Sequence, residues 1–102
     1  MKIITVCGSL RFKDQILESG LKLGLKGNVV LSPVFSNNMN IDDFSERDLK
    51  VLREMHNEKI KLADAIYVVD VDGYIGNQTK NEIEYAKSLG KEIIYYSTDK
   101  KN

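Results

Sequence analysis

Short apolar runs alternate along this chain with longer segments whose apolar residues recur every three or four positions. The runs predict four β-strands, over residues 2–7, 28–31, 65–71 and 92–96. The periodic segments predict helices over residues 11–25, 45–63 and 79–89. Strands that alternate with helices pair in parallel through right-handed crossovers. The pattern therefore predicts an α/β fold, a doubly wound sheet of about four parallel strands in the order 2-1-3-4 with helices on both faces.

Residues at the ends and on the faces of these helices refine the prediction. Ser45, followed by Asp48, fits an N-terminal capping pattern, whereas Gly27 and Gly90 are placed to end the first and third helices. The polar segment 36–43 has neither the helical nor the strand spacing of apolar residues, which predicts an exposed loop. The residues expected to face the core from the first two helices are Phe12, Ile16, Leu17 and Leu21, then Leu49, Leu52, Met55, Ile60 and Ala63.

Length and composition limit the class of protein. The 102 residues suffice for a single domain, over residues 1–102, and their 15 basic and 15 acidic side chains give a formal net charge of +0. A neutral chain lacks the positive charge that binding to nucleic acid polymers or anionic membranes requires. The first strand is too short for a signal peptide and no run reaches the ~20 apolar residues of a membrane span, so we expect a cytoplasmic protein. One cysteine, Cys7, and one histidine, His56, predict neither a disulfide nor a metal site.

The carboxyl edge of a doubly wound sheet binds ligands where the strand order reverses. Here the reversal lies between the first and third predicted strands, so the loops after these strands should share one crevice. The first loop, Gly8-Ser9-Leu10-Arg11, combines a flexible glycine, a hydroxyl and a guanidinium with the free N–H groups of a helix start, which suits a phosphate or another anion. The same residues also have an explanation that needs no ligand. In it, Gly8 turns the chain, Ser9 caps the helix and Arg11 is an ordinary surface cation.

The second loop carries acidic side chains. Asp70 and Asp72 end the third predicted strand, where they are candidates for acid–base chemistry or simply turn formers. Glu82 follows in the next helix and is a candidate nucleophile. Thr79 to Glu82 also fits a capping box, which is the simpler explanation of Glu82, and the helix dipole favours the ionised carboxylate in either case. Two further residues of this region that can contact a ligand are Tyr74 and Asn77.

Five short motifs occur in an order that resembles a known family. They are G-S-L-R at residues 8–11, L-A-D-A-I-Y-V-V at 62–69, D-G-Y-I-G at 72–76, E-I-E-Y-A at 82–86 and L-G-K at 89–91. In this order and spacing they resemble the nucleoside 2-deoxyribosyltransferase superfamily, which includes the 2'-deoxynucleoside 5'-phosphate N-hydrolases with their G-S-x-R loop. Each motif is short, and the resemblance depends on their joint order over nearly the whole chain.

The resemblance implies a flavodoxin-like fold, a homodimer with sites near the subunit interface, and cleavage of an N-glycosidic bond without a cofactor. Glu82 matches the family glutamate in E-x-G-Y-A, which attacks the anomeric carbon as the base departs. Ser9 and Arg11 match the phosphate loop of the hydrolases and would hold a 5'-phosphate. Asp70 or Asp72 would contact sugar hydroxyls or help to protonate the leaving base, and the sequence does not choose between them.

Two residues depart from the family pattern. Glu84 replaces the usual glycine of E-x-G-Y-A, which adds a charged side chain two residues after Glu82 and is expected to narrow the site. His56 lies eight residues before Asp64, where the hydrolases carry an aspartate that assists the leaving base. A histidine can also donate a proton near neutral pH, because its unperturbed pKa is about 6.5. A packed or surface histidine is the alternative explanation of His56.

Two interpretations from different classes remain open at this point. The first is an enzyme that cleaves or transfers the N-glycosidic bond of a nucleoside or its 5'-monophosphate through a carboxylate. The second is a module on the same fold that binds a nucleotide without cleaving it. Retention of Glu82 and of the G-S-x-R loop favours the enzyme, whereas Glu84 and His56 favour the binding module. Fold resemblance does not decide between them.

Overall fold

Four parallel strands form a single sheet in the computed structural model, which describes residues 1–36 and 40–99. The strand order is β2-β1-β3-β4, as the sequence predicted. In the register of the two central strands, Cys7 lies opposite Val68 and Gly8 lies opposite Val69. The strands are β1 Ile3–Gly8, β2 Val29–Leu31, β3 Ala65–Val69 and β4 Glu92–Tyr95.

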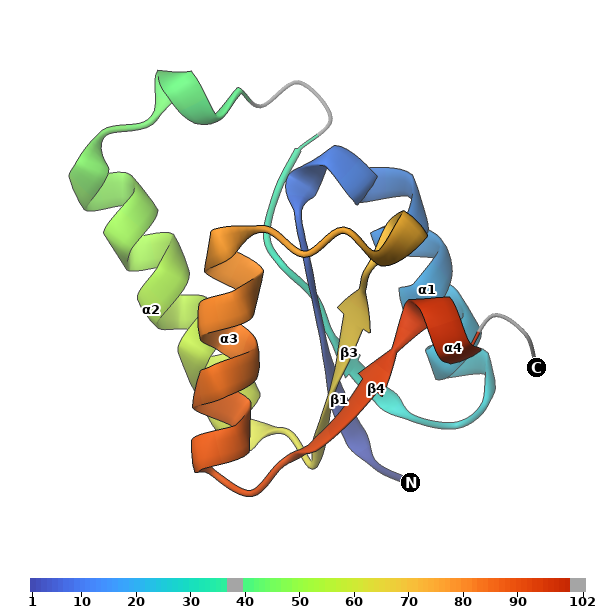
Figure 1. The fold of residues 1–102 in the computed structure, drawn as a ribbon. Helices are drawn as coiled ribbons and strands as arrows, with labels where there is room; N and C mark the ends of the chain where they lie inside the picture. The colour runs from blue at the N-terminus through green and yellow to red at the C-terminus, as the bar shows by residue number, and fades with distance from the viewer. Residues whose placement is uncertain (37–39, 100–102) are drawn as a thin grey trace.

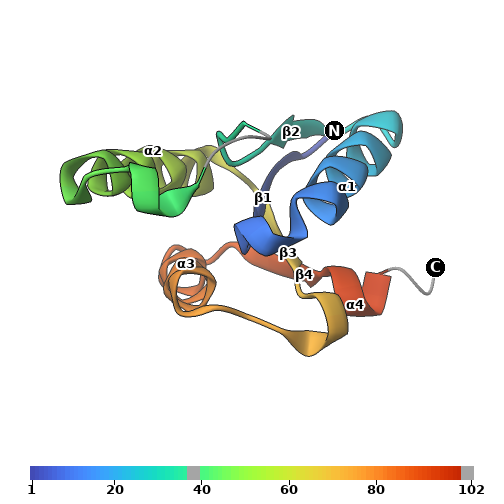
Figure 2. The same ribbon diagram turned by 90° about the horizontal axis from the view of Figure 1, so that it is seen from above.

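Helices cover both faces of this sheet (Figures 1 and 2). One face carries α1 (Lys13–Leu25) and the short α4 (Tyr96–Asp99), and the other carries α2 (Glu46–Leu62) and α3 (Asn77–Ser88). Three short 3-10 helices lie in the connections: η1 Leu10–Phe12, η2 Ile41–Asp43 and η3 Val71–Gly73. Among the residues described, no helix combines the length and the apolarity needed to cross a membrane.

Each face of the sheet has its own core, because the side chains of a strand alternate between the faces. On the α1 side, Val6 and Tyr67 pack against Ile16 of the helix. On the α2 and α3 side, Cys7 and Val68 pack against helix residues. The apolar residues buried in this second core are Cys7, Ile60, Ile66, Val68, Ile83 and Ala86.

The ends of the helices follow the sequence signals. The Ser45 hydroxyl accepts from the N–H of Asp48 at 3.0 Å, and the Asp48 carboxylate accepts from the N–H of Ser45 at 3.3 Å. This reciprocal pair is the predicted capping box of α2. Gly27 and Gly90 follow α1 and α3 with φ of 92° and 72°, which a glycine adopts without strain.

Two predictions about exposure and loops need correction. Leu17 and Leu21 are 55% and 66% exposed, because the buried face of α1 is formed instead by Ile16, Ser19 and Leu23 at helical spacing. In α2, Ile60 is buried, whereas Met55 is 37% exposed. Part of the loop predicted over residues 36–43 forms η2, and residues 37–39 lie outside the described residues.

The turn after β3 holds the C-terminal helix in place. The third strand was predicted to reach Val71, but it ends at Val69 and the chain turns into η3. Asp70 is 5% exposed, and its carboxylate accepts from the N–H of Ser97 at 2.8 Å and from the Ser97 hydroxyl at 2.7 Å. Asp99 of α4 accepts from the Tyr67 hydroxyl at 2.9 Å. Asp70 therefore stabilises the start of α4.

We predict that Asp70→Ala destabilises the fold by about 2 to 4 kcal/mol, because Ser97 loses the acceptor of two partly buried hydrogen bonds. Asp72→Asn is the control, since Asp72 is exposed and asparagine tolerates its positive φ of 53°. Urea unfolding measures both variants. An Asp70→Ala protein as stable as Asp72→Asn would contradict this assignment.

Candidate active site

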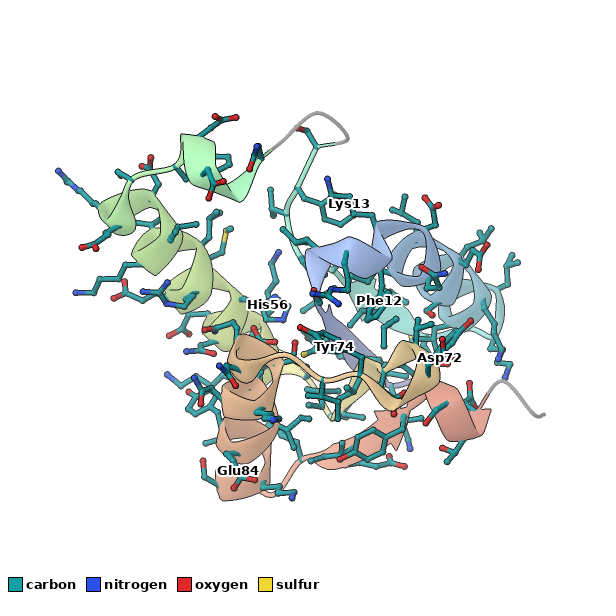
Figure 3. The ribbon with its side chains drawn as sticks, turned by 45° about the horizontal axis from the view of Figure 1, so that its top comes forward. Phe12, Lys13, His56, Asp72, Tyr74 and Glu84 are labelled. Atoms are coloured by element: carbon teal, nitrogen blue, oxygen red, sulfur yellow. The ribbon has the colours of Figure 1, made fainter. Side chains whose placement is uncertain are left out.

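A cavity of about 750 Å³ opens at the carboxyl edge of the sheet. Among the described residues, four parts of the chain line it: the loop after β1, the first turns of α3, one side of α2, and Pro33, Val34 and Asn40 after β2. Figure 3 shows His56 of α2 pointing toward the space between these parts. The cavity therefore lies at the switch point of the strand order, which the sequence predicted as the ligand crevice.

The loop after β1 forms the first wall. Gly8, Ser9, Leu10 and Arg11 all line the cavity, although the Ser9 hydroxyl already accepts from the N–H of Arg11 at 3.3 Å and so caps η1. The Arg11 guanidinium lies 4.1 Å from the centre of the Tyr74 ring, in cation–π geometry. Tyr74 therefore positions this exposed arginine from beside the cavity.

The N-terminus of α3 forms the second wall. The helix begins at Asn77 with Gly76 as its N-cap, and no side chain caps it. Its first N–H groups, which have no partner within the helix, lie at the cavity wall formed by Asn77 and Thr79. The predicted capping box between Thr79 and Glu82 is wrong, because the helix starts two residues before Thr79 and Glu82 lies in its second turn.

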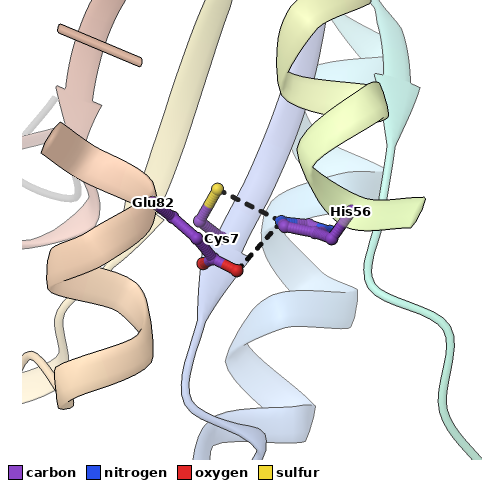
Figure 4. A group of neighbouring side chains, drawn as sticks. All are labelled: Cys7, His56 and Glu82. Atoms are coloured by element: carbon purple, nitrogen blue, oxygen red, sulfur yellow. Dashed lines mark hydrogen bonds and ion pairs between the residues drawn. The ribbon is translucent and has the colours of Figure 1, made fainter. Parts of the chain in front are cut away.

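Three buried polar side chains lie together where β1, α2 and α3 meet (Figure 4), and two of them, His56 and Glu82, line the cavity. The Cys7 Sγ lies 3.4 Å from Nε2 of His56, and the same Nε2 lies 3.8 Å from Oε2 of Glu82. His56 and Glu82 are each 7% exposed, and Cys7 is fully buried. His56 Nδ1 has no hydrogen-bond partner among the described residues. We call Cys7, His56 and Glu82 the buried triad.

Burial controls the protonation of this triad, since it disfavours every charged form. It raises the pKa of Glu82 to about 7, and a hydrogen bond with Gln78 offsets part of the rise. It lowers the pKa of His56 to about 4, helped by the positive charge of Lys59. It raises the pKa of the Cys7 thiol well above its usual range, and the charge of Glu82 adds to this shift.

These shifts correct two expectations. The helix dipole was expected to keep Glu82 ionised, but its effect falls off beyond the first turn, and burial outweighs it. His56 was expected to donate a proton near neutral pH, but with a pKa of about 4 its imidazole is neutral there. Glu82 is thus the group in this triad whose charge changes near neutral pH.

The side of α2 forms the third wall with both apolar and basic residues. Leu49, Leu52 and Met55 line it, as do Arg53 and Lys59. Sequence reasoning missed Lys59, although a lysine three residues after His56 shares its face of the helix. The Lys59 ammonium donates to the Ser32 carbonyl at 2.7 Å, so the lysine also joins α2 to the segment after β2.

The structure brings together most of the residues that the sequence singled out. Asp70 and Asp72 do not line the cavity: Asp70 binds Ser97, and Asp72 is exposed in η3 (Figure 3). Glu84 does not narrow the site, because it is exposed on α3 and lies 3.6 Å from Lys87. The singled-out residues that line the cavity are Gly8, Ser9, Leu10, Arg11, His56, Asn77 and Glu82.

Comparison with known proteins supports the fold. No protein-family model matches the chain, and no curated protein matches it significantly. A solved structure, 2-desoxiribosyltransferase from Leishmania mexicana, superposes on 94% of this chain with a TM-score of 0.66 at 19% identity. The matched region spans 64% of that protein's chain. This likeness shows that the two proteins share a fold.

We predict that Glu82 lowers the stability of the protein as pH rises from about 4.5 to about 7, because the unfolded chain releases this proton near pH 4.5 and the folded chain near pH 7. Relative to Glu82→Gln, the free energy of unfolding of the wild type should fall by about 1 to 3 kcal/mol over this pH range and should not fall further at higher pH. Urea unfolding in a chelator, at a series of pH values, measures the difference. A difference that is constant with pH would contradict the buried position of Glu82.

Proposed function

We propose that this protein cleaves or transfers the N-glycosidic bond of a nucleoside or its 5'-monophosphate, with the carboxylate of Glu82 as nucleophile. The observation that carries the proposal is that Glu82 and the loop Gly8–Arg11 line one cavity. A phosphate held near Arg11 and a sugar carbon held near Glu82 therefore fit one ligand. The fold shared with a 2-desoxiribosyltransferase supports the same class of chemistry.

The proposed reaction has two steps. An oxygen of Glu82 bonds to the anomeric carbon while the bond to the base nitrogen breaks, and the departing base takes a proton from water in the open cavity. In the second step, water bonds to the anomeric carbon while the ester bond to Glu82 breaks, and its proton neutralises the hydroxide left by the first step. In transfer, a second nucleobase bonds to the carbon instead, and its N–H proton goes to that hydroxide. His56 stays neutral and packs beside the carboxylate, with Nε2 3.8 Å from Oε2 of Glu82. Since Glu82 is the carboxylate among the described cavity residues, no second acid assists departure, and we expect slow turnover.

The charges around the cavity favour a phosphorylated substrate. Among the described residues, four cationic side chains line it, against one carboxylate, that of Glu82. A 5'-phosphate would be attracted to this excess of positive charge, whereas an unphosphorylated nucleoside would use only the apolar wall of α2. The four cationic residues are Arg11, Lys13, Arg53 and Lys59.

We expect Glu82→Gln to lower the release of free base from deoxynucleoside 5'-monophosphates by about 10³-fold or more, because the amide cannot form the glycosyl ester. Glu84→Gln is the matched control, since it removes a carboxylate two residues away that is exposed outside the cavity. Chromatography of free base, with chelator present, measures both variants. Full activity of Glu82→Gln would overturn the proposal, and a wild type that binds a nucleotide without releasing base would establish the binding module instead.

Arg11→Ala should weaken the binding of a 5'-monophosphate by ~1.5 to 3 kcal/mol, the value of a hydrogen bond to a charged group. The unphosphorylated nucleoside should bind with nearly unchanged affinity, because it offers Arg11 no phosphate. Titration calorimetry with each matched pair of ligands measures the two effects. An equal loss of binding affinity for the two ligands would show that Arg11 does not hold the phosphate.

A further inference from the structure

The buried triad has the composition of a metal site. A thiol, an imidazole and a carboxyl group come from three separate elements and bring one ligand atom each to within 4.8 Å of the others. Each of the three residues is buried, so the cluster is not an ordinary set of polar surface groups. Nitrogen, sulfur and oxygen ligands of this kind bind zinc and related ions in proteins.

Two of the three separations within the triad lie close to those of ligands that share a single ion. Zinc lies about 2.3 Å from a cysteine sulfur and about 2.0 to 2.2 Å from a histidine nitrogen or a carboxylate oxygen, so tetrahedral ligands lie ~3.3 to 3.6 Å apart. The observed distances are 3.4 Å between Cys7 Sγ and His56 Nε2 and 3.8 Å between His56 Nε2 and Glu82 Oε2. The Cys7 sulfur and a Glu82 oxygen lie within 4.8 Å of each other, so the side chains would have to move closer together to hold one ion.

We infer that Cys7, His56 and Glu82 bind one zinc-type divalent ion, with a fourth position open to the cavity. The ion binds the thiolate sulfur, the lone pair of His56 Nε2 and a Glu82 oxygen, and the protons of the thiol and of any protonated carboxyl go to solvent. Two negative ligands then neutralise the charge of the ion in the buried site. The soft sulfur ligand selects zinc and cobalt over magnesium and calcium.

The surroundings of His56 set the expected strength of binding. A metal-binding histidine usually donates its second ring nitrogen to a partner, and loss of that partner costs about 10- to 100-fold in affinity. His56 Nδ1 has no such partner among the described residues. We therefore expect a reversible site, weaker than a four-ligand structural zinc site.

A bound ion would also regulate the proposed reaction. It would occupy the Glu82 oxygen that attacks the anomeric carbon, so the metal-bound protein would release no base. This consequence rests on the proposed function, whereas metal binding itself does not. We expect saturating Zn²⁺ to lower base release by about tenfold or more, because nearly all of the protein then holds the ion. A chelator should restore the activity.

Titration of tag-free, chelator-treated protein with Co²⁺ under reducing, oxygen-free conditions tests the site. We expect a sulfur-to-cobalt charge-transfer band and visible bands of tetrahedral cobalt, both saturating at one equivalent and both removed by Zn²⁺ but not by Mg²⁺. Cys7→Ala should lose the charge-transfer band, whereas Glu84→Gln, which changes an exposed carboxylate outside the triad, should retain it. Thermal unfolding without metal shows whether Cys7→Ala is folded.

The wild-type spectrum alone decides the question if the cysteine variant does not fold, because Cys7 is the one cysteine in the sequence. Absence of the charge-transfer band at excess Co²⁺, or its persistence in folded Cys7→Ala, would overturn the inference. A protein that binds cobalt but releases no base even when a chelator keeps it free of metal would refute the proposed function and leave the metal site standing. A protein that releases base but binds no cobalt would refute the metal site and leave the proposed function standing.

Discussion

The Glu82 carboxylate is buried where β1, α2 and α3 meet, and the chemistry of the site follows from keeping its charge away from water. Burial raises its pKa to about 7, so near neutral pH the group exchanges between a carboxyl and a poorly solvated carboxylate. A carboxylate with few water contacts is reactive toward a carbon that develops positive charge. Burying this carboxylate lowers the free energy of unfolding, a cost that functional sites commonly carry.

The fold and the position of the cavity could be predicted because they depend on local patterns and on a few topological rules. Four apolar runs separated by helical segments specify a parallel sheet, and the order 2-1-3-4 brings the ends of β1 and β3 together. The start of α2 could also be predicted from the sequence, since the capping pair of Ser45 and Asp48 acts over three residues. Resemblance to the deoxyribosyltransferases drew attention to Glu82 and to the loop at residues 8–11.

The contents of the site could be predicted only in part, because they depend on contacts between distant residues. Thr79 and Glu82 have the spacing of a capping box, but the helix starts earlier, at a glycine N-cap that leaves no signal of this kind. Asp70 looked like a site residue because it follows a central strand, yet its partner, Ser97, lies 27 residues away. Cys7 and His56 are 49 residues apart, and nothing local to either predicts that they meet.

His56 stands where the family that the sequence resembles has an aspartate, and this difference bears on what the buried site could do. Two carboxylates here would repel each other, and one would be held protonated as an acid for the leaving base. The neutral His56 brings neither that repulsion nor that acid, so in the proposed reaction Glu82 would form the bond to the sugar without help from it. His56 also places a ring nitrogen beside the Cys7 sulfur, so the same desolvated Glu82 carboxylate would serve a sugar cation in the proposed reaction and a metal cation in the proposed site. The two proposed uses of Glu82 would compete for the same oxygen.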